Sequence, residues 1–240
     1  MPSSSSPPER QATVPHCLSV GNALSGARGH ERETTLQRSS EGEAPQSETA
    51  RSVLRRNTRP AHMRLERALP LVAPDLTLRE YAETLELYLP IYVTLERAID
   101  LHEGMLSELG FDWPARRKVS LIRRDLDALG SPLPSGRNVP LDAPRCTRTF
   151  SHVMGCLYVL EGSTLGGRLI GRHVETLFHI GPESGAAFFG SYGTAVTAFW
   201  TEFCDVLERA LPDDAARESA SEGAIATFDL FSERVGRRTP

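Results

Sequence analysis

A histidine and a glutamate four residues apart are the first side chains in this sequence whose types and spacing could support chemistry. Leu54, Ala61 and Leu65 recur at helical spacing. This pattern predicts an amphipathic helix with His62 on its apolar face. Glu66 follows one turn later, so its carboxylate should lie beside the imidazole. A carboxylate bound to Nδ1–H fixes the tautomer and leaves Nε2 free as a metal ligand. The alternative is a core histidine hydrogen-bonded to a neighbour.

Two arginines precede this histidine on the same side of the predicted helix. Arg55 and Arg59 could hold the carboxylates of a ligand by charge-assisted hydrogen bonds. A solvated basic face is the alternative. Pro60 disfavours helical geometry at the residue before it, so the helix could instead begin with Thr58 as its N-cap. Arg55 would then lie before the helix, and its reach towards a ligand would be lost.

A cluster of glycines lies inside an apolar, helix-like stretch later in the chain. The segment Glu161-Gly-Ser-Thr-Leu-Gly-Gly contains Gly162, Gly166 and Gly167. Each glycine costs about 1 kcal/mol relative to alanine in a helix interior, so the cluster predicts a kink or a close approach to the backbone. A flat, bulky cofactor would need such a wall, whereas a loop between helices or a tight helix crossing would need no ligand. The cluster is not a phosphate loop, because no strand precedes it and no Gly-Lys-Ser/Thr follows.

The elements that must position these residues are all predicted to be helices. Apolar periodicity indicates a helix through His62 and five more over 78–101, 115–129, 146–180, 190–211 and 215–235. Pro90 should kink the second of these helices and Gly130 should end the third. Asp213 or Asp214 could cap the last. Because no segment shows strand alternation or a hairpin turn, we expect an all-α, bundle-like domain.

Composition divides the chain of 240 residues into two parts. Residues 1–50 are rich in Ser, Pro, Gly, Glu and Gln, and they cannot bury enough apolar surface to offset their ordering entropy, so we expect a disordered tail. Residues 51–236 should form one folded domain. The four prolines at 132, 134, 140 and 144 predict a loop between the helices expected over 115–129 and 146–180.

Charge, hydropathy and cysteine content exclude several classes of function. The net charge of -4 argues against nucleic-acid binding, and no apolar run approaches the roughly 20 residues of a membrane span. No signal peptide is visible, so we expect a cytoplasmic protein. The four cysteines form no CxxC pair and should be reduced. Neither HExxH nor the Glu-x-x-His pairs of di-iron bundles occur.

Two of these segments together resemble the haem oxygenase family. The segment Thr58-Arg-Pro-Ala-His-Met-Arg-Leu-Glu is similar to its proximal helix, and Tyr158-Val-Leu-Glu-Gly-Ser-Thr-Leu-Gly-Gly is similar to its distal helix in the bacterial form. Within this family, the two segments most resemble those of the haem oxygenases that accompany bacteriophytochromes. The resemblance extends over about 52–235, and both motifs at this separation in an all-helical chain are more specific than either alone.

The resemblance implies a single helical domain with haem held between the proximal helix and a glycine-kinked distal helix. It implies that His62 is the axial ligand of the haem iron and that Glu66 is the partner of its imidazole. The other residues that it places at the haem are the distal glycines Gly162, Gly166 and Gly167, the propionate-side arginines Arg55 and Arg59, and the pocket-wall leucines Leu165 and Leu169.

One position departs from the mammalian pattern of the family. That pattern has an aspartate directly after the first distal glycine, where it organises water at the bound oxygen, and here the residue is Ser163. The bacterial relatives also lack this aspartate. A neutral serine can anchor a water but orders the network less strongly.

The resemblance implies that haem, as substrate and cofactor, is opened with O2 to biliverdin, iron and carbon monoxide. An external ferredoxin or NAD(P)H reductase should supply electrons, because the chain has neither a Rossmann fingerprint nor iron–sulfur cysteines. The product could serve a bacteriophytochrome as chromophore precursor, or the reaction could serve iron acquisition. Two alternatives stay open: a haem carrier or sensor on the same fold, and a helical interaction module in which His62 is merely packed.

Overall fold

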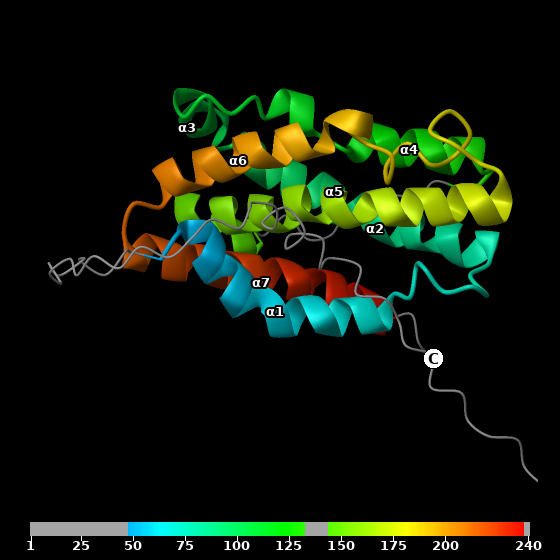
Figure 1. Cartoon of the computed structure of the whole chain (residues 1–240), viewed down its shortest axis with the longest axis horizontal. Coiled ribbons are helices and arrows are strands. Elements are labelled where there is room, and N and C mark those ends of the chain that lie inside the picture. Colours follow the sequence, from blue (N-terminus) through cyan, green and yellow to red (C-terminus); the bar gives the residue numbers. More distant parts are fainter. Residues whose placement is uncertain (1–47, 133–143, 238–240) are drawn as a thin grey trace, which may run out of the picture.

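Helices connected by turns make up the computed structural model, which describes residues 48–132 and 144–237 (Figure 1). The α-helices are α1 (Ala50–Ala68), α2 (Leu78–Asp100), α3 (Glu103–Glu108), α4 (Val119–Ala128), α5 (Phe150–Phe178), α6 (Val196–Ala210) and α7 (Asp214–Gly236). Short 3₁₀ turns are η2 (Pro114–Arg116), η3 (Arg145–Thr147) and η4 (Gly193–Ala195). No strand occurs among these residues, so the all-α prediction is confirmed.

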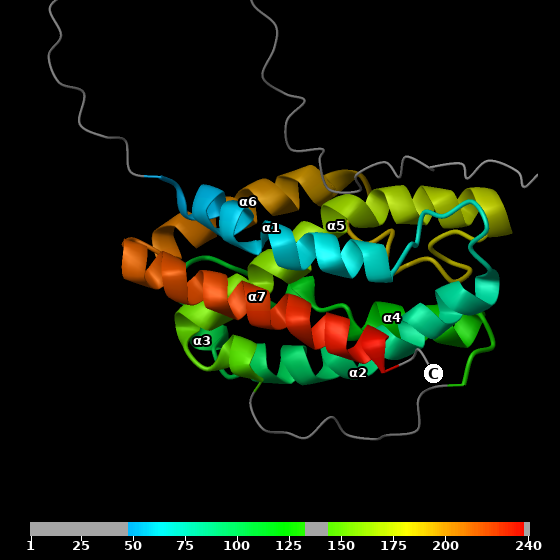
Figure 2. The same ribbon diagram turned by 90° about the horizontal axis from the view of Figure 1, so that it is seen from below.

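The longest helix, α5, runs through the middle of the molecule (Figure 1). It packs against α7 on one side and α6 on another, α1 packs against α7, and α2 packs against α4. Both views show α1 and α5 running in the same direction (Figures 1 and 2). The helices with the predicted histidine and the predicted glycine wall are therefore joined through the same neighbour, α7.

The predicted alternative start of the first helix at Thr58 is wrong. The helix α1 begins earlier, with Thr49 as N-cap, and continues through Pro60. Thr58 is buried and its hydroxyl donates to the carbonyl of Leu54, so it stabilises the helix interior instead of capping an end. Pro60 lies on the exposed side, where water can satisfy the carbonyl that loses its intrahelical donor. Arg55 consequently lies inside the helix.

Other helix boundaries follow the predictions with local differences. The predicted helix over 115–129 is divided into η2 and α4, the one over 190–211 begins only at Val196, and α3 was not predicted. Gly130 does follow the end of α4 with a left-handed φ of 64°, and Asp213 caps α7 by accepting from the amide of Ala216. Residues 1–47 of the predicted tail and 133–143 of the predicted loop lie outside the described residues.

Glycines allow α5 and α7 to cross at backbone contact. A Cβ on Gly155 would lie 1.8 Å from the carbonyl oxygen of Ala220, and one on Gly223 would lie 2.5 Å from the carbonyl oxygen of His152. Real Cβ atoms essentially never come closer than 3.0 Å to such atoms. Only glycine fits at these two positions, so the crossing fixes where the later part of each helix lies.

None of the helices in the described part of the chain is both long enough and apolar enough to span a membrane.

Candidate functional site

His62 lies on α1 in a half-buried position beside α7. Its Nδ1 is 3.6 Å from Oε2 of Glu66, one helical turn further on. The ring of Phe228 on α7 meets the imidazole edge-on, with centroids 5.5 Å apart and planes at 82°. The side chain of His62 keeps 21% of its surface exposed, so the imidazole is oriented by neighbours but not enclosed by them. This geometry leaves room for a ligand on the open side of the ring.

Glu66 is placed to orient the imidazole. A separation of 3.6 Å is longer than a hydrogen bond, and the other carboxylate oxygen, Oε1, is buried without a hydrogen-bond partner. A buried carboxylate oxygen without a donor costs free energy unless a donor becomes available. A small rotation of either side chain would make Nδ1–H that donor and would fix the tautomer with Nε2 as the ligating atom.

A small apolar cluster connects α1, α5 and α7 next to this pair. Its buried members are Ala61, Val159, Ala224 and Phe228, with Leu65 and Tyr158 packed against them. Thr58 on α1 is also a hydrogen-bond partner of the Tyr158 phenol on α5. Because α1 and α5 run in the same direction, the turns after these contacts lie toward the same end of the two helices (Figures 1 and 2). Those turns contain His62 and Glu66 on α1 and the glycines on α5.

The glycine segment is helical throughout, so the alternative of an interhelical loop is wrong. A Cβ on Gly162 would make only ordinary contact, 3.6 Å from the indole of Trp200 on α6. A Cβ on Gly167 would lie 3.1 Å from the carbonyl oxygen of Phe189, so this glycine does admit a close backbone neighbour. Gly166 is buried. Packing within the protein therefore explains Gly167 in part but does not require a glycine at 162.

Ser163 and the predicted wall leucines differ in exposure. Leu165 is half-buried, whereas Ser163 is exposed and Leu169 keeps 40% of its surface exposed. Leu169 is thus the one predicted wall residue that presents a large apolar surface to solvent.

Sequence reasoning missed Tyr92 as the partner of Ser163. The hydroxyl of Ser163 donates to the carbonyl of Leu160 at 2.7 Å and is also a hydrogen-bond partner of the Tyr92 phenol on α2. Burial raises the pKa of Tyr92, so the phenol stays neutral and can donate a hydrogen bond to the serine oxygen. No sequence pattern connects the two residues, because α2 meets α5 only in the folded structure.

A second missed group lies behind the glycine segment, around Glu161. This carboxylate is 2% exposed and accepts from the guanidinium of Arg116 at 2.7 Å and from the hydroxyl of Tyr192 at 2.9 Å. Burial raises the pKa of Glu161, and the positive charge of Arg116 opposes this shift. Lys118, the only lysine of the chain, lies with Nζ 3.2 Å from the centroid of the Tyr192 ring.

The two predicted arginines are exposed on α1. Among the described residues, neither Arg55 nor Arg59 forms an ion pair with an acidic side chain. The positive charge of Arg55 does lower the pKa of the Tyr158 phenol, which burial raises. Arg55 is therefore close enough to α5 for its charge to act on Tyr158.

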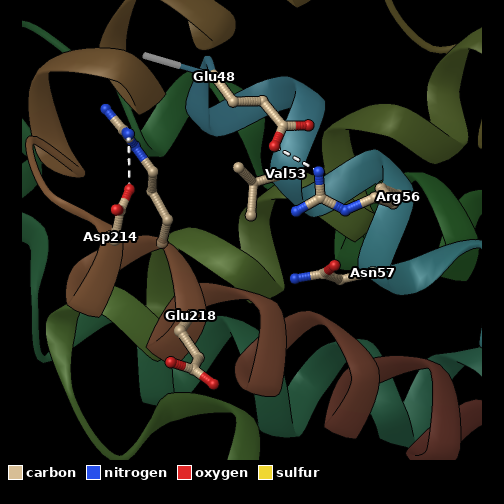
Figure 3. Close-up of a pocket in the computed structure, with 7 residues that line it drawn as sticks. Glu48, Val53, Arg56, Asn57, Asp214 and Glu218 are labelled. Carbon is tan, nitrogen blue, oxygen red and sulfur yellow. Dashed lines mark hydrogen bonds and ion pairs between the residues drawn. The ribbon is translucent and has the colours of Figure 1, made fainter. Parts of the chain in front are cut away.

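A cavity of about 420 Å³ opens elsewhere on α1, where its N-terminal half meets the start of α7 (Figure 3). Four of its charged side chains form two pairs, Arg56 with Glu48 and Arg217 with Asp214. Another cavity, of about 340 Å³, lies beside the turn between α1 and α2. Neither is lined by a predicted site residue, so the candidate site is defined by the partly exposed side chains of α1 and α5 and by neither of these cavities.

The donor set at this site fits a haem. No group of three or more His, Cys, Asp or Glu side chains in the described ranges is arranged to hold a bare metal ion. A haem iron instead needs a single imidazole from the proximal side, and His62 with the unpartnered oxygen of Glu66 offers one with its orienting carboxylate.

Comparison with known proteins gives one consistent result. The family model described as Heme oxygenase matches residues 48–237. The chain is 33% identical over 135 residues to a heme oxygenase of Xanthomonas campestris pv. campestris (strain 8004), a match covering 55% of this chain and 74% of that protein. Its fold is similar to the NO- and CO-bound heme oxygenase of Neisseria meningitidis (TM-score 0.67, 20% identity, 79% of this chain and 91% of that chain). It is also similar to the heme oxygenase of Leptospira interrogans (TM-score 0.66, 16% identity, 79% and 100%). The chain belongs to the haem oxygenase family.

Proposed function

We propose that this protein binds haem at the open face between α1 and α5 and degrades it, with His62 as the axial ligand of the iron. The observation that carries the proposal is the pairing of His62 with Glu66 on α1 alongside a helical glycine segment on α5. Membership of the haem oxygenase family supports haem degradation as the reaction. The residue roles rest on the geometry of this chain.

Each side of the site has a distinct task in this proposal. When bound, haem supplies the iron that activates O2 and the ring that is opened. Glu66 holds the His62 imidazole in one tautomer. Gly162, Gly166 and Gly167 allow the α5 backbone to come close to the opposite side of the ring, with Leu165 and Leu169 as apolar wall. Arg55 and Arg59 lie where they could reach carboxylates at the edge of the site.

Protons on the distal side are handled by neutral hydroxyls. Ser163 and Tyr92 form a hydrogen-bonded pair, and burial keeps the phenol of Tyr92 protonated. The pair can hold a water at the site by hydrogen bonds, through which protons from solvent can reach the bound ligand, although a neutral pair orders water less strongly than a carboxylate. This assigns to two hydroxyls the role for which the mammalian pattern uses an aspartate.

We infer biliverdin, iron and carbon monoxide as the products, in a cytoplasmic setting. Electrons come from an external ferredoxin or NAD(P)H reductase, because the sequence contains no dinucleotide-binding fingerprint and no cluster of cysteines that could hold an iron–sulfur centre. A bacteriophytochrome as acceptor of the biliverdin is a further hypothesis, supported only by the character of the two motifs.

A haem carrier or sensor is the second candidate, and Ser163 is the observation that favours it. Without a carboxylate beside the first distal glycine, haem could be bound and left intact. The two functions differ in a single measurable step, the disappearance of the haem when electrons are supplied.

Haemin titration followed by reduction tests the proposal. The wild-type protein should give a stoichiometric Soret band that His62→Ala loses, while the control His173→Ala, which affects a histidine held by the carbonyl of Ala73, should keep it. Reductant under air should then replace the Soret band with biliverdin absorption. The absence of a Soret band in the wild type would exclude both haem functions, and a stable band under reduction would leave only the carrier.

A further inference from the structure

The carboxylate of Glu161 occupies a position on α5 directly before the glycine segment, on a side that is fully buried. It is held from two other parts of the chain, by Arg116 of η2 and by Tyr192 of the turn before η4. Tyr192 keeps a left-handed backbone, with φ of 65°, although it is not a glycine. A non-glycine residue in this conformation persists only where its surroundings fix it.

Arg116 is as deeply buried as the carboxylate it binds. Its guanidinium lies 4.7 Å from the ring centroid of Phe111 and 4.5 Å from that of Phe199, and it also donates to the carbonyl of Phe199 at 3.1 Å. The ring of Tyr192 stacks on Phe199 with centroids 4.2 Å apart. The guanidinium therefore has little freedom to move, and the position of Glu161 is fixed with it.

A buried ion pair of this kind is not explained by stability alone. Removing two charges from water costs about as much as their attraction returns, and apolar residues of similar volume often stabilise a core equally well. What an ion pair with defined hydrogen bonds adds is geometry, because it is satisfied in only one arrangement. Here that arrangement connects α5 to η2 and to the turn before η4.

The glycine segment of α5 depends on bonds from its buried side to fix its position. Glycine lacks a side chain that could pack against a neighbour, and each glycine in a helix costs about 1 kcal/mol relative to alanine. The glycines at 162–167 therefore contribute little to fixing the position of α5. Trp200 of α6 supports Gly162 only by an ordinary contact. Beside the contact of Ser163 with Tyr92, the carboxylate of the residue preceding Gly162 adds directional bonds to two other parts of the chain.

We propose that Glu161, bound by Arg116 and Tyr192, is a positioning residue that fixes the distance of Gly162 and Ser163 from the haem. The three residues are called the Glu161 anchor below. Glu161 acts through the backbone of α5 and does not touch the haem itself. The inference deepens the proposed function and rests on it for the haem, whereas the anchoring of α5 is a property of the protein without ligand.

Hydrogen exchange of the haem-free protein, followed by mass spectrometry, tests the anchor without any turnover. Glu161→Gln keeps the shape but removes the charge, and Tyr192→Phe removes one hydroxyl while keeping the ring that stacks on Phe199. In both variants, amides of peptides covering 157–168 should exchange at least about tenfold faster, while peptides of α7 should be unchanged. Glu202→Gln is the matched control, because Glu202 binds the same guanidinium at 3.1 Å but is half exposed and lies on α6.

The haem-bound protein gives the second measurement. Binding of haemin through His62 should persist in both anchor variants, but the bilin isomers formed should change from one predominant isomer to a mixture, since the distal segment is displaced. Exchange that is unchanged in both variants, or that rises equally in α7, would overturn the anchor. A wild-type protein that binds no haem would overturn the proposed function and the positioning role with it, while the exchange data would still decide whether Glu161 anchors α5.

Discussion

The ring of Phe228 on α7 meets the imidazole of His62 on α1 edge-on, at 82° and with centroids 5.5 Å apart. These residues are far apart in the sequence, and their contact constrains the plane of the imidazole from a different helix than the one that carries Glu66. Phe228 is itself held by the apolar cluster that it shares with Ala61, Val159 and Ala224. The orientation of the candidate ligand thus depends on the packing of three helices.

Replacement of Phe228 should show whether haem binding depends on the orientation of the His62 imidazole and not only on its presence. Phe228→Leu keeps the cluster largely filled but removes the aromatic edge, so we expect unfolding to become easier by about 1 to 2 kcal/mol and haemin to bind more weakly. Urea unfolding and haemin titration measure the two effects. Phe231→Leu, also buried on α7 but packed against Tyr88 and Tyr92, should lower stability without a matching loss of haemin affinity. An unchanged affinity in Phe228→Leu would mean that the contact does not orient His62.

Loss of the carboxylate beside His62 should weaken haem binding without abolishing it. Glu66→Gln keeps the volume but removes the strong acceptor for Nδ1–H, and loss of such a partner typically costs about 10- to 100-fold in affinity for the metal or in activity. Haemin titration should therefore show a dissociation constant raised by about tenfold or more, with a Soret band still present. Glu83→Gln, which alters an i,i+4 pair with Arg79 on α2, is the control. Equal affinities in the two variants would contradict the assignment of Glu66.

Glycine-to-alanine variants should divide into structural and ligand-facing positions. Gly155→Ala places a methyl group against the backbone of α7, which cannot move aside, so we expect a loss of at least about 3 kcal/mol or a failure to fold. Gly162→Ala meets only Trp200 at ordinary distance and should leave the haem-free protein as stable or up to about 1 kcal/mol more stable. Its effect should appear in haemin binding and turnover, because the methyl group would enter the haem face.

Thermal unfolding of the haem-free variants, followed by haemin titration, checks this division. Gly104→Ala in α3, where a Cβ would meet nothing within 4 Å, is the control for helix propensity alone. A Gly162→Ala variant that binds and degrades haem like the wild type would show that the α5 glycines are not needed for close approach to the ring.

Periodicity predicted the elements of this fold well, because it depends on which face of each helix is buried. The apolar side of α1 is an example: Leu54 and Ala61 are buried as their spacing requires, and His62 lies next to them. The proline rule failed at Pro60 for a tertiary reason, since contacts of α1 with α7 and α6 outweigh one missing hydrogen bond on an exposed side.

The partners of the site residues could not be predicted in the same way. Phe228 and Tyr92 come from helices far along the chain from the residues they contact, and their positions depend on how those helices cross. Arg116 gave no signal at all, because an arginine in an arginine-rich stretch is indistinguishable from its exposed neighbours until the fold buries it. The sequence also did not distinguish Gly155 and Gly223, which allow α5 and α7 to cross at backbone contact, because isolated glycines are common.

Lys118 should make stability depend on pH in a defined window. Burial lowers the pKa of Lys118 from 10.5 to about 8, with Glu161 and Glu96 opposing the shift and Arg116 adding to it. Between pH 8 and 10.5 the unfolded chain holds a proton at this lysine that the folded chain does not, so its contribution to the free energy of unfolding rises with pH. Below pH 8 the folded protein carries a buried charge at a cost of about 3 kcal/mol, from about 1.4 kcal/mol per pKa unit.

Lys118→Met therefore should be more stable than the wild type at pH 7, and this advantage should shrink as the pH rises from 8 to 10.5. Buried tyrosines such as Tyr92 and Tyr192, whose pKa values are raised, act in the opposite direction above pH 10, but they are shared by both proteins and cancel in the difference. Urea unfolding of both proteins at closely spaced pH values measures it. A difference that stays constant with pH would show that Lys118 is not charged differently in the folded and unfolded chains.

Removal of residues 1–47 should be tolerated, whereas a deletion three residues longer should not. The two deletions differ by the three residues 48–50. The predicted tail, 1–50, overlaps the first turn of α1, where the hydroxyl of Thr49 caps the helix and the amides of Ala50 and Arg51 donate to the carboxylate of Glu208 at 2.8 and 3.1 Å. Removal of residues 1–47 should leave haemin binding and turnover intact. Removal of 1–50 takes away the cap and one of these donors, so we expect the free energy of unfolding to fall by about 1 to 2 kcal/mol and α1 to fray towards Leu54.

Thermal unfolding of the two truncated proteins distinguishes them, and a Glu208→Gln variant of the full chain should reproduce part of the loss. If the shorter deletion already abolished turnover, residues 1–47 would have a role in the reaction; if the longer one cost nothing, the cap and Glu208 would not stabilise α1.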